Sequence, residues 1–204
     1  MSKSTKVLHF CLSFLSVYNI WAKVTGFNAR FKVNSISHTL RLILKMAAIA
    51  GMGANAKTET SSLSEFFAFG AFAWGVESIS HLEVVYLCIK DPNYKDHLSQ
   101  NIFFFIVELL NVTVYMCLSC FATTAEIGSI YTAWMVFFLT GTTMTPAIWA
   151  LFLAKITRAL KIGDFNPKIN SLPMNVHYVT ERFGLFQIIV IGETVIAGSA
   201  GFDG

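Results

Sequence analysis

The sequence predicts an all-α fold, a polytopic bundle of about six transmembrane helices that forms a single region over residues 1–204. Charged residues make up only 13% of the chain, about half the ~25% found in ordinary globular domains. Hydrophobic residues make up 54%, with 19 phenylalanines, and the mean hydropathy is +0.58. So few charges cannot cover a water-facing surface. This excludes a disordered chain, a nucleic-acid binder and an ordinary cytosolic enzyme.

Long apolar stretches mark the expected helices. A transmembrane helix needs about 20 largely apolar residues. The approximate spans are 7–24, 40–56, 63–89, 102–121, 127–156 and 183–200. The second span is the weakest, because Arg41 and Lys45 lie in its first turns. We expect helices rather than the strands of a membrane barrel, because runs such as FFFIV do not alternate apolar with polar residues.

Basic residues predict the orientation of these helices, because cytoplasmic loops of membrane proteins are enriched in Lys and Arg. The loops near 25–39, 90–101 and 157–182, with the adjoining helix ends, hold 12 of the 15 Lys and Arg residues. This count includes Arg41 and Lys45, whose side chains we expect to extend back to the near interface. The three loops are therefore predicted to be cytoplasmic, in an integral protein of the plasma membrane or an endomembrane.

Small residues recur at four-residue spacing within the predicted helices. The pairs are Ala47 with Gly51, Ala50 with Ala54, and Ala71 with Gly75. Such faces allow close helix approach within lipid. The expected partners of the chain are therefore the bilayer itself and further copies of the chain, which would meet through these faces.

Ionisable residues deep in the apolar stretches are the candidate functional residues. Glu77 and His81 are four residues apart and therefore share one helix face. The remaining candidates are Glu108, Asn111 and Glu193. A charge at the bilayer centre costs about 2.5–3.5 kcal/mol on insertion scales, so such residues usually face the bundle interior. They indicate either a polar path for protons or ions, or interhelical hydrogen bonds that fix the packing.

Other chemistries are less well supported by the sequence. Glu77, His81 and Glu108 have donor types that suit a metal, but there is no Glu-x-x-His pair and no second histidine on a partner helix. Cys117 and Cys120 lie within an apolar run, which favours packed or lipid-facing thiols. Motifs for nucleotide binding or hydrolase catalysis are absent. We therefore expect no catalytic residues, metal or cofactor, and a non-enzymatic protein is favoured.

A motif near the end of the chain carries a family resemblance. Residues 181–193 read ERFGLFQIIVIGE, and His177 precedes them. This resembles the signature of the low temperature requirement A (LtrA) family of multi-pass membrane proteins. The motif residues are His177, Glu181, Arg182, Phe183, Gly184, Leu185, Phe186, Gly192 and Glu193. The stretch from Trp21 to Ala56 is similar to the early region of the family's fungal-type branch.

The chain departs from the family pattern at both ends. Members usually begin with an acidic-aromatic helix of the type E-L-F-x-D-L, which has no counterpart here, and they continue with further helices beyond the Gly-Glu pair. The resemblance therefore implies an inner portion of the family architecture, without the first helix and the C-terminal half.

The resemblance implies a membrane protein but supplies no reaction. The buried acids favour a transport component, or one that conducts ions or protons, with the polar path described above. The alternatives are a structural or accessory membrane protein, a truncated family member with little independent activity, and a membrane enzyme that uses Glu and His chemistry.

Overall fold

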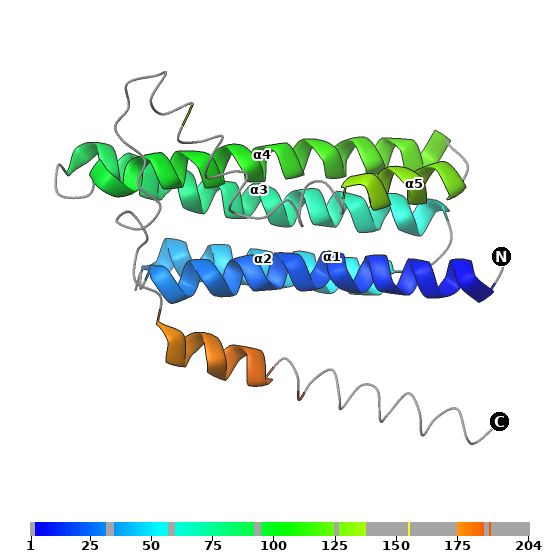
Figure 1. Cartoon of the computed structure of the whole chain (residues 1–204), viewed down its shortest axis with the longest axis horizontal. Coiled ribbons are helices and arrows are strands. Elements are labelled where there is room, and N and C mark those ends of the chain that lie inside the picture. The colour runs from blue at the N-terminus through cyan, green and yellow to red at the C-terminus, as the bar shows by residue number, and fades with distance from the viewer. Residues whose placement is uncertain are drawn as a thin grey trace. The chain divides into compact units, whose positions relative to one another are not determined.

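The computed structural model describes residues 3–31, 35–56, 60–91, 95–124, 127–137, 155, 175–185 and 188. These residues are helical apart from short connections, and no strand occurs among them. The predicted all-α class is therefore confirmed. The helices in Figure 1 are α1 (Lys3–Arg30), α2 (Ile36–Ala54), α3 (Thr60–Lys90), α4 (Lys95–Thr124) and α5 (Ile127–Phe137). A further helix covers 176–185.

The chain divides into two units. The first comprises Met1–Trp21 and Asn34–Ser171, and the second comprises Ala22–Val33 and Leu172–Gly204. Within the second unit, the backbone N–H of Asn175 donates to the Ala29 carbonyl at 3.1 Å. This bond joins the start of the 176–185 helix to the end of α1.

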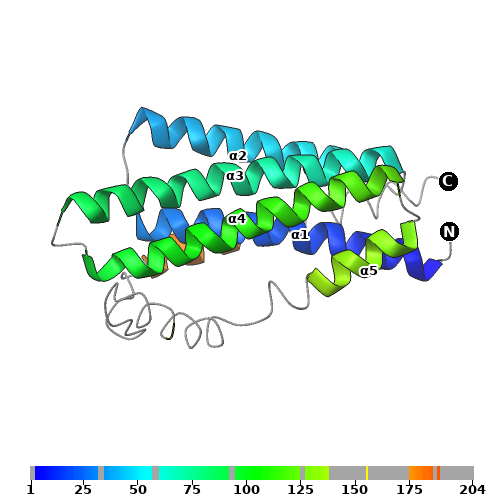
Figure 2. The ribbon, with the colours of Figure 1, turned by 90° about the horizontal axis from the view of Figure 1, so that it is seen from above.

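Within the first unit, α3 is the central helix and packs against both α2 and α4 (Figure 2). Aromatic side chains fill the interior, because Trp74, Tyr115 and Trp134 are almost completely buried. Two hydroxyls fix α3 against α4. Ser64 Oγ donates to the Ser119 carbonyl at 3.0 Å, and Ser119 Oγ donates to the Ser64 carbonyl at 2.9 Å. Such reciprocal bonds satisfy hydroxyl groups that could not form hydrogen bonds with lipid chains.

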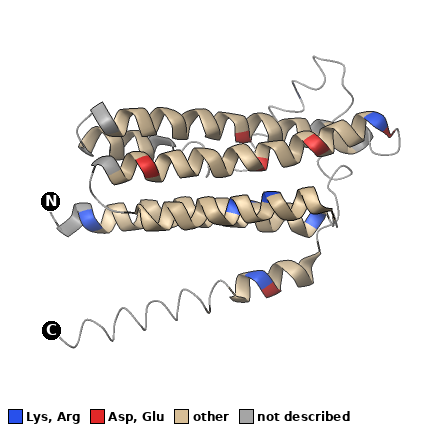
Figure 3. Cartoon of the chain, turned by 180° about the vertical axis from the view of Figure 1, so that it is seen from behind, with Lys and Arg blue, Asp and Glu red and all other residues tan. Residues whose placement is uncertain are grey.

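Three of the described helical segments are long and apolar enough to cross a membrane, namely Lys6–Arg30, Ser62–Lys90 and Gln100–Ala122. Figure 3 shows how few of the described residues along them are charged. The helices extend beyond the spans predicted from sequence by up to seven residues, as α4 does at its start. Hydropathy marks only the part of a helix that lies in hydrocarbon, whereas backbone hydrogen bonding continues into the polar interface.

The fifth and sixth predicted spans are only partly covered by the described residues. The fifth, 127–156, is described as helix as far as Phe137. Of the sixth, 183–200, the described residues are 183–185 and 188, all helical. The remainder, with Gly192 and Glu193, lies outside the described residues.

Close helix contacts occur at two glycines of the first unit. A Cβ atom on Gly51 of α2 would lie 2.7 Å from the Phe69 ring of α3, so this small-residue position is a close contact within the chain. On α3, a Cβ atom on Gly70 would overlap the Tyr115 ring of α4. Gly70 lies outside the predicted small-residue pattern, because the residues four positions away on either side, Phe66 and Trp74, are large. Gly75 has more room, since Val112 Cγ2 would be 4.0 Å away.

Candidate functional site

Three of the predicted candidates meet in a buried cluster between α3 and α4. Glu77 and His81 lie one turn apart on α3, and Glu108 lies on α4. These three residues are almost entirely inaccessible, at 1%, 6% and 1% relative exposure. One ligand atom from each lies within 4.8 Å of the others. The predicted gathering of ionisable side chains inside the bundle is therefore observed for these three residues.

His81 connects the cluster to the end of the bundle where α3 is followed by α4. Its Nδ1 is 3.2 Å from Asn101 Oδ1. Asn101 Nδ2 donates to the His97 carbonyl at 2.8 Å, which fixes the orientation of the amide. Because Oδ1 can only accept, His81 Nδ1 must carry a proton and donate it.

The other ring nitrogen, His81 Nε2, is 3.2 Å from Glu108 Oε1. With Nδ1 already protonated, a neutral ring would present a lone pair toward an ionised carboxylate, which is repulsive. The contact is attractive when one further proton is present, either on Nε2 or on the carboxyl group. The geometry therefore defines a position for one proton shared between His81 and Glu108.

Lys45 of α2 is the cation of the cluster. Its side chain forms an ion pair with Glu77 and donates to Ser80 Oγ at 3.1 Å. It is 1% exposed, so the expectation that it extends to the interface is wrong. The physical reason is that an ammonium ion can also avoid hydrocarbon by pairing with a buried carboxylate. Ser80 in turn donates to the Val76 carbonyl at 3.1 Å.

A second ion pair lies one turn from Lys45 on α2. Arg41 pairs with Glu83 of α3, and their side chains are 12% and 40% exposed. This pair is therefore closer to the bundle surface than Lys45 and Glu77. The two pairs together set the register of α2 against α3 in an antiparallel arrangement, since the residue numbers rise on one helix as they fall on the other.

The charges of the cluster balance only when the shared proton is present. Lys45 and Glu77 cancel each other, so the remaining charge is that of the Glu108 carboxylate. A proton bound between His81 and Glu108 makes the whole cluster neutral, and its loss leaves one net negative charge in the interior. Burying net charge is unfavourable, and the form of these four residues without net charge is the one that carries the shared proton.

The same three donors could in principle hold a metal ion, because Glu77, His81 and Glu108 offer nitrogen and oxygen ligands at short mutual distances. However, Glu77 already contacts the Lys45 ammonium. A metal ion would have to share this carboxylate with a fixed positive charge. The donor set as folded therefore favours a proton site over a metal site.

The other predicted residues lie apart from the cluster or outside the described part of the chain. Asn111 is buried on α4, three residues after Glu108, but the described contacts include none between it and the cluster.

In the 176–185 helix, His177, Glu181 and Arg182 are exposed, and the Arg182 guanidinium lies 5.2 Å from the Tyr178 ring centre. No described atom lies within 4 Å of a Cβ placed on Gly184.

Sequence reasoning missed Lys45, Ser80 and Asn101 as members of the site. Asn101 immediately precedes the predicted span 102–121, so it was assigned to a loop. Ser80 is a common residue in membrane helices and carries no distinctive signal. For Lys45, the antiparallel pairing of two consecutive helices could have placed it opposite Glu77.

His38 lies in the first turn of α2, before the predicted span at 40–56. Partial burial, and then the positive charges of Lys45 and Arg41, lower the pKa of His38. Ser35 caps the same turn, because its Oγ accepts from the His38 backbone N–H at 3.1 Å. The lowered pKa of His38 favours the neutral form of its imidazole.

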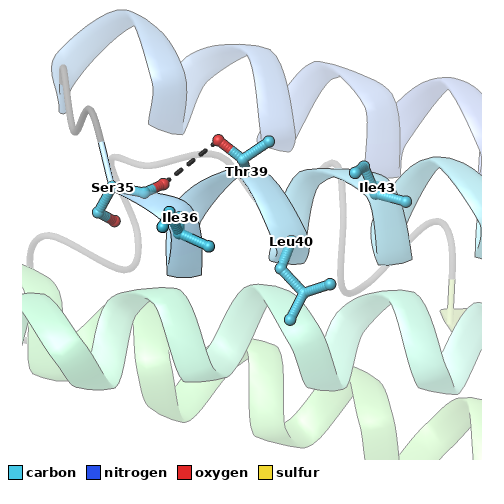
Figure 4. A pocket seen from close by; sticks show the side chains of 5 residues that line it. All are labelled: Ser35, Ile36, Thr39, Leu40 and Ile43. Carbon is cyan, nitrogen blue, oxygen red and sulfur yellow. Dashed lines mark hydrogen bonds between the residues drawn. The ribbon is translucent and has the colours of Figure 1, made fainter.

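An open pocket lies beside this turn and is separate from the polar cluster. Its lining residues are Ser35, Ile36, Thr39, Leu40 and Ile43 (Figure 4). Thr39 Oγ1 donates to the Ser35 carbonyl at 3.2 Å, so this hydroxyl is already bonded. The lining holds no ionisable group, and its apolar face suits a lipid chain better than a charged ligand.

Comparison with protein families gives a match over the whole chain. The family model described as bacterial low temperature requirement A protein (LtrA) matches residues 1–204. Comparisons with curated proteins and with solved structures give no match.

Proposed function

Because this chain belongs to the low temperature requirement A family of membrane proteins, we propose that it is a transport component in which protons cross the bundle through the buried cluster. The path includes Glu77, His81 and Glu108. Glu193, which the sequence also suggests, lies outside the described residues, so the proposal depends on the first three.

The observation that carries this proposal is the shared proton position between His81 and Glu108. Asn101 holds His81 Nδ1 at 3.2 Å, so Nε2 faces the carboxylate at 3.2 Å. Imidazole gains and loses protons near neutral pH, and carboxylates accept and release them readily. A proton on Nε2 can therefore move to Glu108 Oε1 by exchanging one N–H bond for one O–H bond, with no movement of the helices.

The buried ion pair supports proton transport over the transport of larger cations. Lys45 is fixed by Glu77 and Ser80. A hydrated metal cation would have to displace Lys45 to reach the Glu77 carboxylate, whereas a proton can pass between bonded groups without displacing Lys45.

A second candidate function is a structural or accessory role. It is favoured by one observation, namely that polar contacts such as those between Ser64 and Ser119 occur elsewhere between α3 and α4. Such contacts contribute about 0.6 kcal/mol each in membranes. In this case the cluster would fix helix packing and conduct nothing.

Proton flux into liposomes tests the proposal. Wild-type protein should dissipate an imposed pH gradient, measured with an enclosed pH-sensitive dye, and the His81→Gln and Glu108→Gln variants should slow this by about a hundredfold. The matched control is Glu83→Gln, which removes a carboxylate that is 40% exposed and should leave flux unchanged.

Two results would contradict the path. The first is a proton flux in His81→Gln and in Glu108→Gln that equals the flux of the wild-type protein. This result would place the path elsewhere. The second is wild-type flux no greater than that of empty liposomes, combined with lower melting temperatures of both variants. The second result would establish the packing role instead.

A further inference from the structure

A second polar cluster lies in the first unit, on the N-terminal part of α1. His9, Ser13 and Ser16 are spaced by four and three residues, so they share one face of the helix. All three are buried, at 4%, 6% and 0% exposure. On a helix long enough to span a membrane, this polar face is turned into the protein rather than toward lipid.

Aromatic residues of α5 and α3 cover this face. The His9 ring centre lies 5.7 Å from that of Tyr131 and 6.3 Å from that of Trp134. Trp134 Nε1 donates to Ser16 Oγ at 3.1 Å, which fixes α5 against α1. Behind Trp134, the rings of Phe66 and Phe67 lie 5.6 and 4.9 Å away.

The contacts of His9 define its proton arrangement. Nε2 is 3.3 Å from the carbonyl oxygen of Ala56, just after α2. A carbonyl oxygen only accepts, so Nε2 carries a proton and donates it. In the neutral ring Nδ1 then has a free lone pair. Nδ1, Ser13 Oγ and Tyr131 Oη are all buried, and none has a hydrogen-bond partner among the described residues.

Three polar atoms without partners on facing helices indicate a binding site for a small polar group. Leaving each of them unbonded in a low-dielectric interior is unfavourable. Water is the ligand class that fits, because it donates to the Nδ1 lone pair and also bonds to hydroxyl groups, and buried waters typically make two to four such bonds.

His9 and His81 lie toward opposite ends of the first unit. His9 contacts Ala56, between α2 and α3, whereas His81 contacts Asn101, after the connection from α3 to α4. Along α3, Phe67 beside the His9 cluster and His81 are separated by about 21 Å of helical rise. A path through the bundle needs a proton-binding group toward each end.

We propose that His9 is a second proton-binding site, which takes up a proton at Nδ1 from water held against Ser13 and Tyr131. This inference rests on the proposed function, because it supplies the other end of the same path. In each cycle one N–H bond forms at Nδ1 as an O–H bond of protonated water breaks, and release reverses the exchange. The Nε2–H bond to Ala56 stays intact throughout.

The groups around His9 suit this role. From α5, the titratable group is Tyr131, which is neutral at pH 7. From α3, Phe66 and Phe67 contribute no charge. On α1 itself, Lys6 lies about one turn earlier and is exposed. The described hydrogen-bond and ring contacts of His9 include no carboxylate.

Nitrogen NMR of the intact protein, with ¹⁵N-labelled histidine, tests this site in lipid bilayers. The His9 signals, assigned from their loss in His9→Gln, should show proton uptake at Nδ1 as the pH falls from 8 to 5. Magnetisation transfer from water to His9 should be strong in wild type and weaker in Ser13→Ala and Tyr131→Phe. The exposed His177 provides the reference signal for a hydrated histidine.

Flux measurements on the same samples complete the test. His9→Gln should slow proton flux as strongly as His81→Gln does, whereas His177→Gln should not slow it. A His9 ring that stays neutral down to pH 5, or that receives no transfer from water, overturns the inference. A proton flux in His9→Gln that equals the flux of the wild-type protein also overturns the inference. If His9 takes up protons in contact with water but wild-type protein conducts none, the proposed function fails while the proton-binding site at His9 stands.

Discussion

Replacing Lys45 by methionine is expected to destabilise the folded protein by about 3–5 kcal/mol, the cost of removing one partner from a buried ion pair. Methionine fills a similar volume but leaves the Glu77 carboxylate without a counterion. Both side chains of this pair are 2% exposed, so water cannot take over the role of the ammonium. The free energy of unfolding in mixed detergent micelles, titrated with a denaturing detergent, measures the loss.

Two further variants separate this effect from simple loss of contacts. The double variant Lys45→Met with Glu77→Gln should recover most of the stability, because no unpaired charge remains. Arg41→Met is the matched control, since its partner Glu83 is 40% exposed and such pairs contribute about 0–1 kcal/mol. Equal losses for Lys45→Met and Arg41→Met would contradict the buried ion pair.

Gly70→Ala is expected to be the most damaging single-methyl addition among the described glycines. The added Cβ would overlap the Tyr115 ring. That ring is 1% exposed and has little room to move. Overpacking of this kind costs about 1–3 kcal/mol, which exceeds the gain of up to about 1 kcal/mol that alanine gives over glycine in a helix.

Gly75→Ala provides the comparison on the same helix. Its Cβ would lie 4.0 Å from Val112, an ordinary contact, so this variant should be neutral or slightly more stable than wild type. Thermal melting of both purified variants in one detergent measures the difference. If the Gly70→Ala and Gly75→Ala proteins melted at the same temperature, close packing of α3 on α4 at Gly70 would be refuted.

The positions of the helices were predictable because hydrocarbon imposes a simple requirement on sequence. Spanning segments need long apolar runs, and α3 and α4 both contain one. Their ends were not predictable from hydropathy, because backbone hydrogen bonding continues where the apolar run stops. The N-terminal turns of α4 before residue 102 are the clearest case.

The candidate site was predictable only in part. Glu77, His81 and Glu108 stand out because ionisable residues are rare within apolar runs. Lys45 does not, because a lysine near the end of a weak span is ordinarily explained by its long side chain reaching the interface. His9 lies in the first turn of the predicted span 7–24, where a polar residue is unremarkable. Only the contacts of α5 with α1 show that its ring is enclosed.

The two hydroxyls that join Ser64 to Ser119 have a mechanical consequence. Each donates to the backbone carbonyl of the other residue, at 3.0 and 2.9 Å, so sliding α3 along α4 would break both bonds at once. The two bonds therefore hold α3 and α4 in register at this position. A motion that leaves both bonds intact would have to displace helices other than this pair.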